Sequence, residues 1–425
     1  GQFNRNDHVQ VRYAIAGHSG PIAADETWSP DLVHHVTDDI TVENGATLTL
    51  EPGTVVKLAS LTSIVIASGG SLIAEGTVAE PVIFTALYDD ARGGDSNGDG
   101  TLTSPAPGDW ISINVDGGVA QLDHVEIRYG GGTTAGSWNY SGALRTANDG
   151  AVQVRSSTIV HSFYDGVLVQ GGDMVLENTI VADTDRGVVA WLGDAAARVV
   201  NSTFDDNRIG LLAHGGTLEV VNTIVAHSLD AGIDRDILPD PTVRYCDVWS
   251  DRPGAVDFRG ISDGTGADGN ISADPLFKNR SAGDYRLSAG SPAIDAADGA
   301  VAPETDSYGA PRFNDPATHN TGTATPSGDY ADIGALEFIE TAESDIDLVI
   351  GSVTGPISGT QDDLVTVSWT GTNTGTLPAT GSWHDAVYLS ADGIWTPDDP
   401  PVGEALHSGD VGAGKSYSGT ADVTL

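Results

Sequence analysis

The chain has 425 residues, and its 60 aspartates and glutamates outnumber 19 lysines and arginines, giving a formal net charge of −41. This charge repels nucleic acid and anionic membranes, which excludes both as partners. No apolar run approaches the ~18 residues of a membrane-spanning helix, so we expect no membrane insertion. The length predicts two or three domains. The single cysteine, Cys246, allows no internal disulfide, and we expect it to be a small buried apolar residue.

The N-terminal part predicts one separate strand and then a series of short strands. In residues 7–16, DHVQVRYAIA, apolar and polar side chains alternate as they do in a half-buried strand. After Trp28, the segments 40–58 and 63–87 alternate in the same way and turn at Gly or Pro-Gly, and residues 120–131 continue the pattern.

A polar loop at 88–110 interrupts this pattern and carries a candidate Ca²⁺ site. Its stretch 93–101 reads GGDSNGDGT, in which Asp and Asn oxygens alternate before a glycine, as Ca²⁺ coordination around a tight turn requires. An EF-hand is excluded because Ala106 stands where its last glutamate belongs. Asp89 and Asp90 are alternative ligands, and an ion-free polar loop is the competing interpretation. We expect the ligands Asp95, Asn97, Asp99, Thr101 and Asp109.

Residues 151–237 contain four copies of a repeat about 22 residues long. Each copy holds two or three short β-rich runs, and helical periodicity is absent. This period predicts the coils of a right-handed parallel β-helix, about eight to ten of them over residues 30–250. The repeated positions are Thr158, Thr179, Thr203 and Thr223, and Gly166, Gly187, Gly210 and Gly232.

Acidic residues at one turn of the repeat are the candidate catalytic groups. Asp165, Asp185 and Asp230 precede the repeated glycine by one or two residues, and Asn207 takes a similar place. Stacked coils would set them in one row about 4.8 Å apart, close enough for a pair of carboxylates to act on a glycosidic bond. The competing interpretation is structural, because Asp and Asn before Gly are typical turn residues. The aromatics at 138–140 and Trp191 are candidates for stacking on sugars.

The segments at both ends of the repeat carry a resemblance. Residues 28–58 are similar to the opening coils of large bacterial surface β-helix proteins, and 271–298 with 331–338 are similar to the segment that closes such helices. The loop at 88–110 resembles the calcium-type inserts of these proteins. The resemblance implies a secreted or cell-surface scaffold.

From residue 345 the sequence changes in character. DIDLVIGSVTG and WHDAVYLSADG resemble the bacterial cell-adhesion-related domain (CARDB), an immunoglobulin-like sandwich. Alternation at Val365, Val367 and Trp369 and a hairpin-like run at 386–390 independently favour a sandwich, which looks incomplete at its C-terminal edge. The expected fold is therefore all-β, with an N-terminal strand or cap at 1–27, a β-helix with its closing segment at 28–340, and a partial sandwich at 345–425.

These features favour an extracellular structural or adhesive protein that Ca²⁺ stabilises and that has a cell-surface or matrix polysaccharide as a possible partner. The alternative is a polysaccharide lyase or glycoside hydrolase on the same scaffold, since a β-helix alone does not decide between the two. A further hypothesis is a homo-polymer, in which residues 7–16 of one copy add a strand to the open sandwich of another. The simpler alternative is that 7–16 caps the first coil.

Overall fold

The computed structural model describes residues 14–100, 102–133, 141–339, 348–356, 363–374, 377–389 and 401–424. The chain divides into two compact units, Gly1–Phe338 and Ile339–Leu425. The first unit is a right-handed parallel β-helix, and small antiparallel sheets form the second, so the predicted all-β fold is confirmed. Among the described residues, no helix has the length and apolar character needed to cross a membrane.

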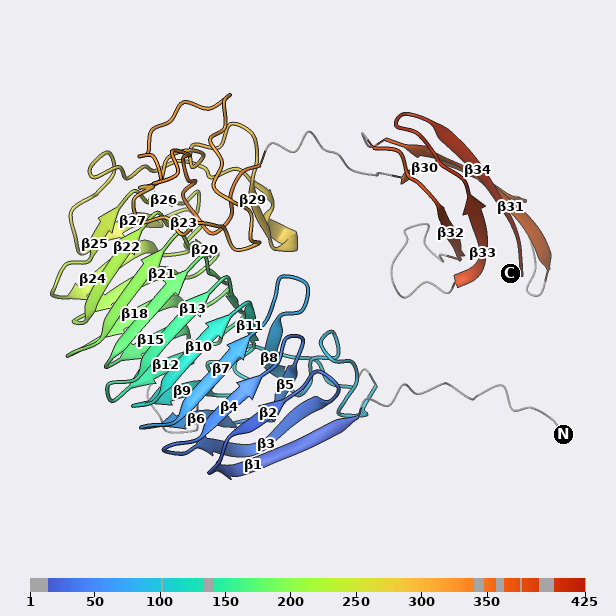
Figure 1. Ribbon diagram of the computed structural model, residues 1–425. Helices are drawn as coiled ribbons and strands as arrows, with labels where there is room; N and C mark the ends of the chain where they lie inside the picture. The colour runs from blue at the N-terminus through green and yellow to red at the C-terminus, as the bar shows by residue number, and fades with distance from the viewer. Residues whose placement is uncertain are drawn as a thin grey trace. The chain divides into compact units, whose positions relative to one another are not determined.

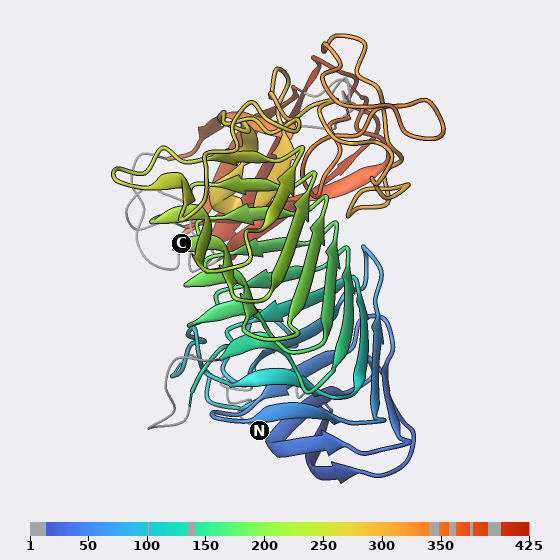
Figure 2. The same cartoon turned by 90° about the vertical axis from the view of Figure 1, so that its left-hand side faces the viewer.

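The first sheet of the β-helix contains the first strand of each coil. Nine such strands run parallel in the described residues, in an unbroken order from one end of the stack to the other. Figure 2 shows the strands of successive coils lying over one another. The strands are β2 (Glu26–Trp28), β4 (Thr47–Leu50), β7 (Ser71–Glu75), β10 (Val119–Asp123), β13 (Ala151–Arg155), β16 (Asp173–Glu177), β19 (Ala196–Val200), β22 (Thr217–Val221) and β25 (Thr242–Arg244).

The middle sheet contains the second strand of each coil, and the third sheet contains the last. They join into one 18-stranded sheet because β1 (Ile15–Ile22) and β3 (Val33–Val42) run through both. The middle sheet adds β5 (Val55–Leu58), β8 (Val82–Ala86), β11 (Val125–Arg128), β14 (Thr158–Val160), β17 (Ile180–Ala182), β20 (Thr203–Asp205), β23 (Ile224–Ala226) and β26 (Asp247–Trp249). The third adds β6 (Ser63–Ala67), β9 (Ser112–Asp116), β12 (Gly142–Ala147), β15 (Asp165–Gln170), β18 (Arg186–Trp191), β21 (Ile209–His214), β24 (Ala231–Ile237) and β27 (Val256–Arg259).

An apolar core fills the space between the three sheets. Each strand alternates, so that residues such as Leu176 and Phe204 are fully buried inside while their neighbours face outward. Burying a leucine or phenylalanine side chain contributes about 1.5–3 kcal/mol, and the stack repeats this gain in every coil. Cys246 lies in the same core with no exposed surface, as predicted.

Two columns of left-handed residues make the corners on either side of the middle sheet. Asn and Asp tolerate positive φ better than most residues, which explains why they recur there. The first column, between the first and middle sheets, contains His124, Ser156, Asn178, Asn201, Asn222 and Tyr245. The second column, between the middle and third sheets, contains Tyr129, His161, Asp183, Asp206 and His227.

The N-terminal end of the stack is covered by β1, which pairs in parallel with β3 from Ile15 to Ile22. Of the predicted strand at 7–16, residues 7–13 lie outside the described part of the chain. The insertion at 88–110 covers the outer face of the middle sheet near this end. The Ser96 hydroxyl is 2.8 Å from Nε2 of the buried His35, and the buried Lys57 ammonium donates to the Gly94 carbonyl at 2.6 Å.

The closing segment, residues 260–338, covers the outer face of the same sheet nearer its other end (Figure 1). It contains β28 (Phe277–Asn279), the short 3₁₀ helix η1 (Arg280–Ala282) and β29 (Asp284–Leu287). Outward-facing Ile180, Ala182 and Ile224 are buried beneath it. The segment therefore lies along several coils. It also extends the middle sheet beyond β26, where Ile271 forms a parallel bridge with Asp247.

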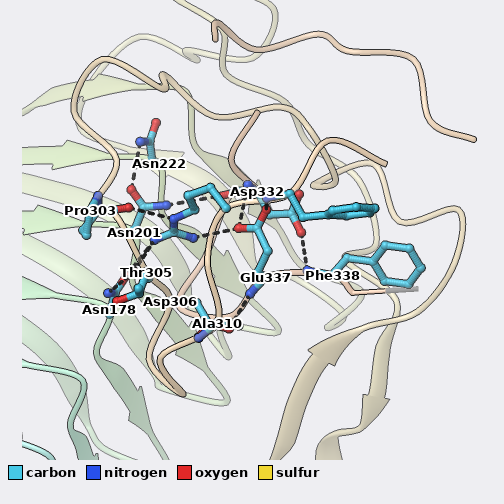
Figure 3. Close-up of polar contacts among 12 residues, drawn as sticks. Asn178, Asn201, Asn222, Pro303, Thr305, Asp306, Ala310, Asp332, Glu337 and Phe338 are labelled. Atoms are coloured by element: carbon cyan, nitrogen blue, oxygen red, sulfur yellow. Dashed lines mark hydrogen bonds and ion pairs between the residues drawn. The ribbon is translucent and has the colours of Figure 1, made fainter. Parts of the chain in front are cut away.

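A buried polar network attaches the closing segment to the first turn column (Figure 3). The Arg312 guanidinium donates to the Glu337 carboxylate at 2.8 Å and to the Asn178 side-chain oxygen at 3.1 Å. The Asn201 and Asn222 amides donate to backbone carbonyls of the closing segment at 3.0 Å. Because buried polar groups must be hydrogen-bonded, these contacts fix which coils the segment covers.

The second unit forms two small antiparallel sheets. One contains β30 (Leu348–Thr354), β31 (Leu364–Asn373) and β34 (Ser416–Thr424), and the other contains β32 (Ser382–Tyr388) and β33 (Pro401–Ser408). Side chains of both sheets pack around the buried Trp369, including Val367 of β31 and Val387 of β32. The alternation predicted at 365–369 is therefore that of a strand with one face in a sandwich core.

Candidate functional site

The structure does not place the acidic turn residues in the predicted single row. In the strand register, Asp165 stands opposite Arg186 of the next coil, and the coils after that place Ile209 and Ala231 at the same position. Asp185 comes one residue before Arg186, because the turns differ in length, and is therefore not opposite Asp165. The expectation of stacked, adjacent carboxylates is therefore wrong.

Arginines of neighbouring coils engage these carboxylates. Arg186 donates to both oxygens of Asp165, at 2.5 and 3.1 Å, and Arg208 binds Asp185 in the same bidentate way at 2.5 and 3.2 Å. Arg208 also reaches Asp230 at 2.9 Å.

This arrangement is an ion-pair ladder along the stack. Arg259 extends it by donating to Asp230 and Asp234, each at 2.6 Å. Complete burial raises the pKa of Asp165 to about 7, an effect that the Arg186 charge opposes. Asn207 is also structural, since its side-chain oxygen accepts from the Thr184 backbone and hydroxyl at 3.1 and 2.7 Å. These groups hold coils together, which favours the structural interpretation of the turn column.

Three carboxylates gather in the insertion. Oxygens of Asp90, Asp95 and Asp99 lie within 4.8 Å of one another. The Asp95 carboxylate accepts from the backbone amides of Gly98, Asp99 and Gly100 at 2.8–3.1 Å, which shapes the turn. Oδ1 atoms of Asp90 and Asp99 are buried without a hydrogen-bond partner. Burial and the Asp95 charge raise the pKa of Asp90.

The other predicted Ca²⁺ ligands have different places. The Asn97 amide lies beside the cluster and donates to Asp99 at 2.9 Å. Thr101 lies outside the described residues. Asp109 is not in the group, because its carboxylate accepts from the Ala106 amide three residues earlier, at 2.8 Å. Of the two alternatives to Asp109, Asp90 joins the cluster, whereas the buried Asp89 accepts from the Thr85 hydroxyl at 2.6 Å.

A groove of about 560 Å³ lies on the outer face of the middle sheet. Its floor consists of β11 and β14 with the adjoining turn residues, including Glu126, Thr158 and His161. One wall is formed by the β7–β8 turn and Arg92 of the insertion, and the opposite wall by residues 280–285 and 307–308 of the closing segment. The groove thus lies between the two covers of this sheet.

Glu126 is the central charged group of the groove floor. Arg92 of the insertion donates to both its oxygens at 3.1 Å, and Arg128, two residues along β11, forms a second ion pair with it. Burial by itself would raise the pKa of Glu126, but the two arginines outweigh it and hold the pKa below its usual range. Glu126 therefore stays ionised and fixed in position.

A second acid, Asp183, stands at the edge of the floor in the second turn column. Its carboxylate is 3.5 Å from Nδ1 of His161, and burial raises its pKa while His161 opposes the rise. Burial also lowers the pKa of His161, whose ring stacks on Tyr129. The groove therefore holds two carboxyl groups whose surroundings shift their pKa values in opposite directions.

The wall from the closing segment combines an anchored arginine with two tyrosines. Arg280 of η1 donates to the buried Asp205 at 2.8 Å and also forms an ion pair with Asp206. Tyr285 is buried in the contact between the segment and the coils, whereas Tyr308 is 51% exposed. Tyr308 is thus a groove residue with half of its surface exposed.

Of the aromatic residues predicted to stack on sugars, Trp191 is not a groove residue. Trp191 stacks on His214 of the next coil, with ring centroids 3.7 Å apart, on the third sheet. Residues 138–140 lie outside the described part of the chain.

The groove residues were not among the residues predicted from the sequence. Glu126 and Arg128 look like ordinary outward positions of an alternating strand, and Tyr308 lies in an irregular segment 180 residues away from them. The sequence contained a weak signal of covered and open positions along the middle sheet. In the strand register, Glu126 lies between Ile83 and Thr158, and Thr158 is followed by Ile180, so apolar outward residues stand on both sides of a polar pair. The covers that make this region a groove come from distant parts of the chain.

A match to a protein family agrees with the β-helix. A family profile described as a pectate-lyase-like beta helix domain matches residues 20–153. Among solved structures, the Dettilon tailspike protein (gp208) aligns over 94% of this chain and 87% of its own, with 11% identity and a TM-score of 0.24. The comparison with curated proteins finds no match.

Proposed function

We propose that the protein is an extracellular adhesive scaffold that binds a polysaccharide through the outer face of its β-helix and does not cleave it. The observation that carries this proposal is the contrast between two acidic regions. The carboxylates of the turn column are used in ion pairs between coils, whereas the groove is a preformed concave surface with fixed polar groups. The similarity to a pectate-lyase-like domain supports a β-helix that handles polysaccharide.

Ca²⁺ is the proposed stabiliser of the insertion. The donor set fits a hard cation, since the carboxylates of Asp90, Asp95 and Asp99 converge and two of their oxygens lack other partners. Asn97 and the backbone carbonyl of Thr101 remain candidate ligands. A bound ion would neutralise the cluster and hold the loop that carries Arg92, one wall of the groove.

The second unit is the proposed adhesive or linking module. Its sandwich core around Trp369 supports a resemblance to the cell-adhesion-related domain, with Asp385 accepting from the Trp369 indole and from the Tyr417 hydroxyl, each at 2.9 Å. A secreted or cell-surface location accords with these parts. Strand addition between copies through residues 7–16 stays a prediction.

The second candidate function is a polysaccharide lyase or glycoside hydrolase with its site in the groove. It is favoured by the pair Glu126 and Asp183, because two carboxyl groups with oppositely shifted pKa values are typical of acid and base roles. Against it, both carboxylate oxygens of Glu126 are already bound by arginines.

A polysaccharide screen separates these functions. The intact chain would be incubated with neutral and acidic polysaccharides, and both co-sedimentation and new reducing or unsaturated ends would be measured. We expect retention of a polysaccharide without new chain ends. Turnover that Asp183→Asn abolishes, with the fold retained, would establish the enzyme instead, and an absence of retention by any polysaccharide would contradict the binding function.

A further inference from the structure

The groove is a part of the middle sheet that two covers leave open. At one end His35 and Lys57 attach the insertion to the sheet, and at the other Ile180 and Ile224 are buried beneath the closing segment. Between these covers, Glu126 and Arg128 of β11 and Thr158 of β14 are polar and partly exposed, and Glu126 and Thr158 are in register. The other outward residue of β14, Val160, is buried against the closing segment. A continuous cover would have buried these polar groups, and each would then need a partner in the cover, as His35 and Lys57 have in the insertion.

We propose that this groove takes an uncharged, hydroxyl-rich sugar unit of a glycan, held between Tyr308 and the β7–β8 turn above Glu126. This inference rests on the proposed polysaccharide-binding function and names its site and ligand class. The groove volume of about 560 Å³ falls within the ~300–1,000 Å³ of typical small-ligand sites. That space accommodates a short stretch of a glycan chain.

The pairing of the charged groups argues for a neutral ligand. Arg92 and Arg128 both bind Glu126, and Arg280 is held by two aspartates, so each guanidinium in the groove already has an acidic partner. An anionic sugar would have to displace one of these partners, and it would approach a chain of net charge −41. Anionic sugars are therefore disfavoured as ligands of this groove.

The same pairs suit hydroxyl groups. A sugar hydroxyl donates one hydrogen bond and accepts others, so it needs donors and acceptors side by side. The groove offers guanidinium donors beside the Glu126 carboxylate, with the Thr158 side chain on the adjacent strand. Because ion pairs already hold Glu126 and Arg128, little side-chain freedom would be lost on binding.

The two walls supply apolar surface for the faces of a sugar ring. Tyr308, 51% exposed, stands on the closing segment, and Val78, 53% exposed, lies in the β7–β8 turn on the opposite wall. Ligand sites commonly combine such apolar walls with a few fixed polar groups. Both residues are at the surface, so both can be replaced without disturbing the core.

The test measures binding of defined oligosaccharides by isothermal titration calorimetry. The probes are neutral cello-, malto- and galacto-oligosaccharides, and the charged probes are oligogalacturonates and sulfated oligosaccharides. The variants are Tyr308→Ala and Val78→Trp, which remove one wall and fill the groove from the other. Phe313→Ala is the matched control, since Phe313 lies in the closing segment, is 39% exposed and is not a groove residue.

We expect a neutral probe to bind, with an affinity that both groove variants weaken by about tenfold or more and the control leaves unchanged. The affinity should not fall as salt rises, because no ion pair with the ligand forms. Preferential binding of a charged probe with strong salt dependence would overturn the ligand class. Binding of polysaccharide that neither groove variant weakens would overturn the site but leave the proposed function standing, whereas no binding of any probe or polysaccharide would refute both.

Discussion

Arg312 offers the sharpest test of how the closing segment is attached to the coils. Its side chain is 3% exposed and that of Glu337 is fully buried, and the guanidinium also donates to the Pro303 and Thr305 carbonyls at 2.9 and 3.1 Å. Arg312→Leu leaves the Glu337 charge buried without its cation. Breaking a buried pair in this way costs about 3–5 kcal/mol, so we expect a loss of that size in the stability of the closing segment.

Hydrogen exchange of peptides from 291–338, read by mass spectrometry, measures this loss locally. Arg286→Leu is the control, because Arg286 pairs with Asp284 at 2.6 Å in the same segment but its side chain is 53% exposed, and exposed pairs contribute at most about 1 kcal/mol. Burial raises the pKa values of Glu337 and Asp332, so the variant should regain protection as the pH falls and these groups become neutral. An Arg312→Leu loss no larger than that of the control would refute the buried-pair reasoning.

Leu176→Ala, in the fully buried core, should cost about 2–5 kcal/mol in chemical denaturation, and a loss below 1 kcal/mol would mean that the coils are loosely packed. Burial raises the pKa of Asp247 to about 7, above its unfolded value near 4, so the chain should lose stability as the pH rises from about 4 to 7. Asp247→Asn should flatten this pH dependence of stability, and a variant with an unchanged profile would contradict the prediction. Ca²⁺ should protect residues 88–110 from proteolysis, chelator or Asp95→Asn should remove the protection, and equal cleavage in every case would exclude a Ca²⁺ role. Deleting residues 1–16 should abolish any assembly seen by sedimentation, and the filament hypothesis fails if the intact chain stays monomeric with Ca²⁺ at high concentration.

The fold could be predicted from the sequence because the β-helix repeats a local pattern. Recurrent Thr and Gly positions gave the length of each coil, and Cys246 is buried in the core as predicted. The same local reasoning failed at the acidic turns. A one-residue difference in turn length moves Asp185 out of register with Asp165. The repeat already contained this offset, because Asp165 directly precedes its repeated glycine whereas Asp185 precedes its own by two residues.

The groove could not be predicted because it depends on contacts between distant segments. Glu126 meets Arg92 from an insertion 34 residues earlier, and Tyr308 reaches the same face through a segment without regular structure. Alternation in the sequence shows only that such a residue points outward, away from the core. Which outward residues are covered and which remain open depends on hydrogen bonds such as Asn178 to Thr305, 127 residues apart.

A crystal structure with a bound neutral oligosaccharide, grown in Ca²⁺, would locate both the sugar and the ion. We expect an intact sugar chain in the groove, over Glu126 and against Tyr308, with a cation among Asp90, Asp95 and Asp99. A sugar bound instead on the third sheet beside Asp165 and Asp185, or a cleaved chain in the groove, would contradict it.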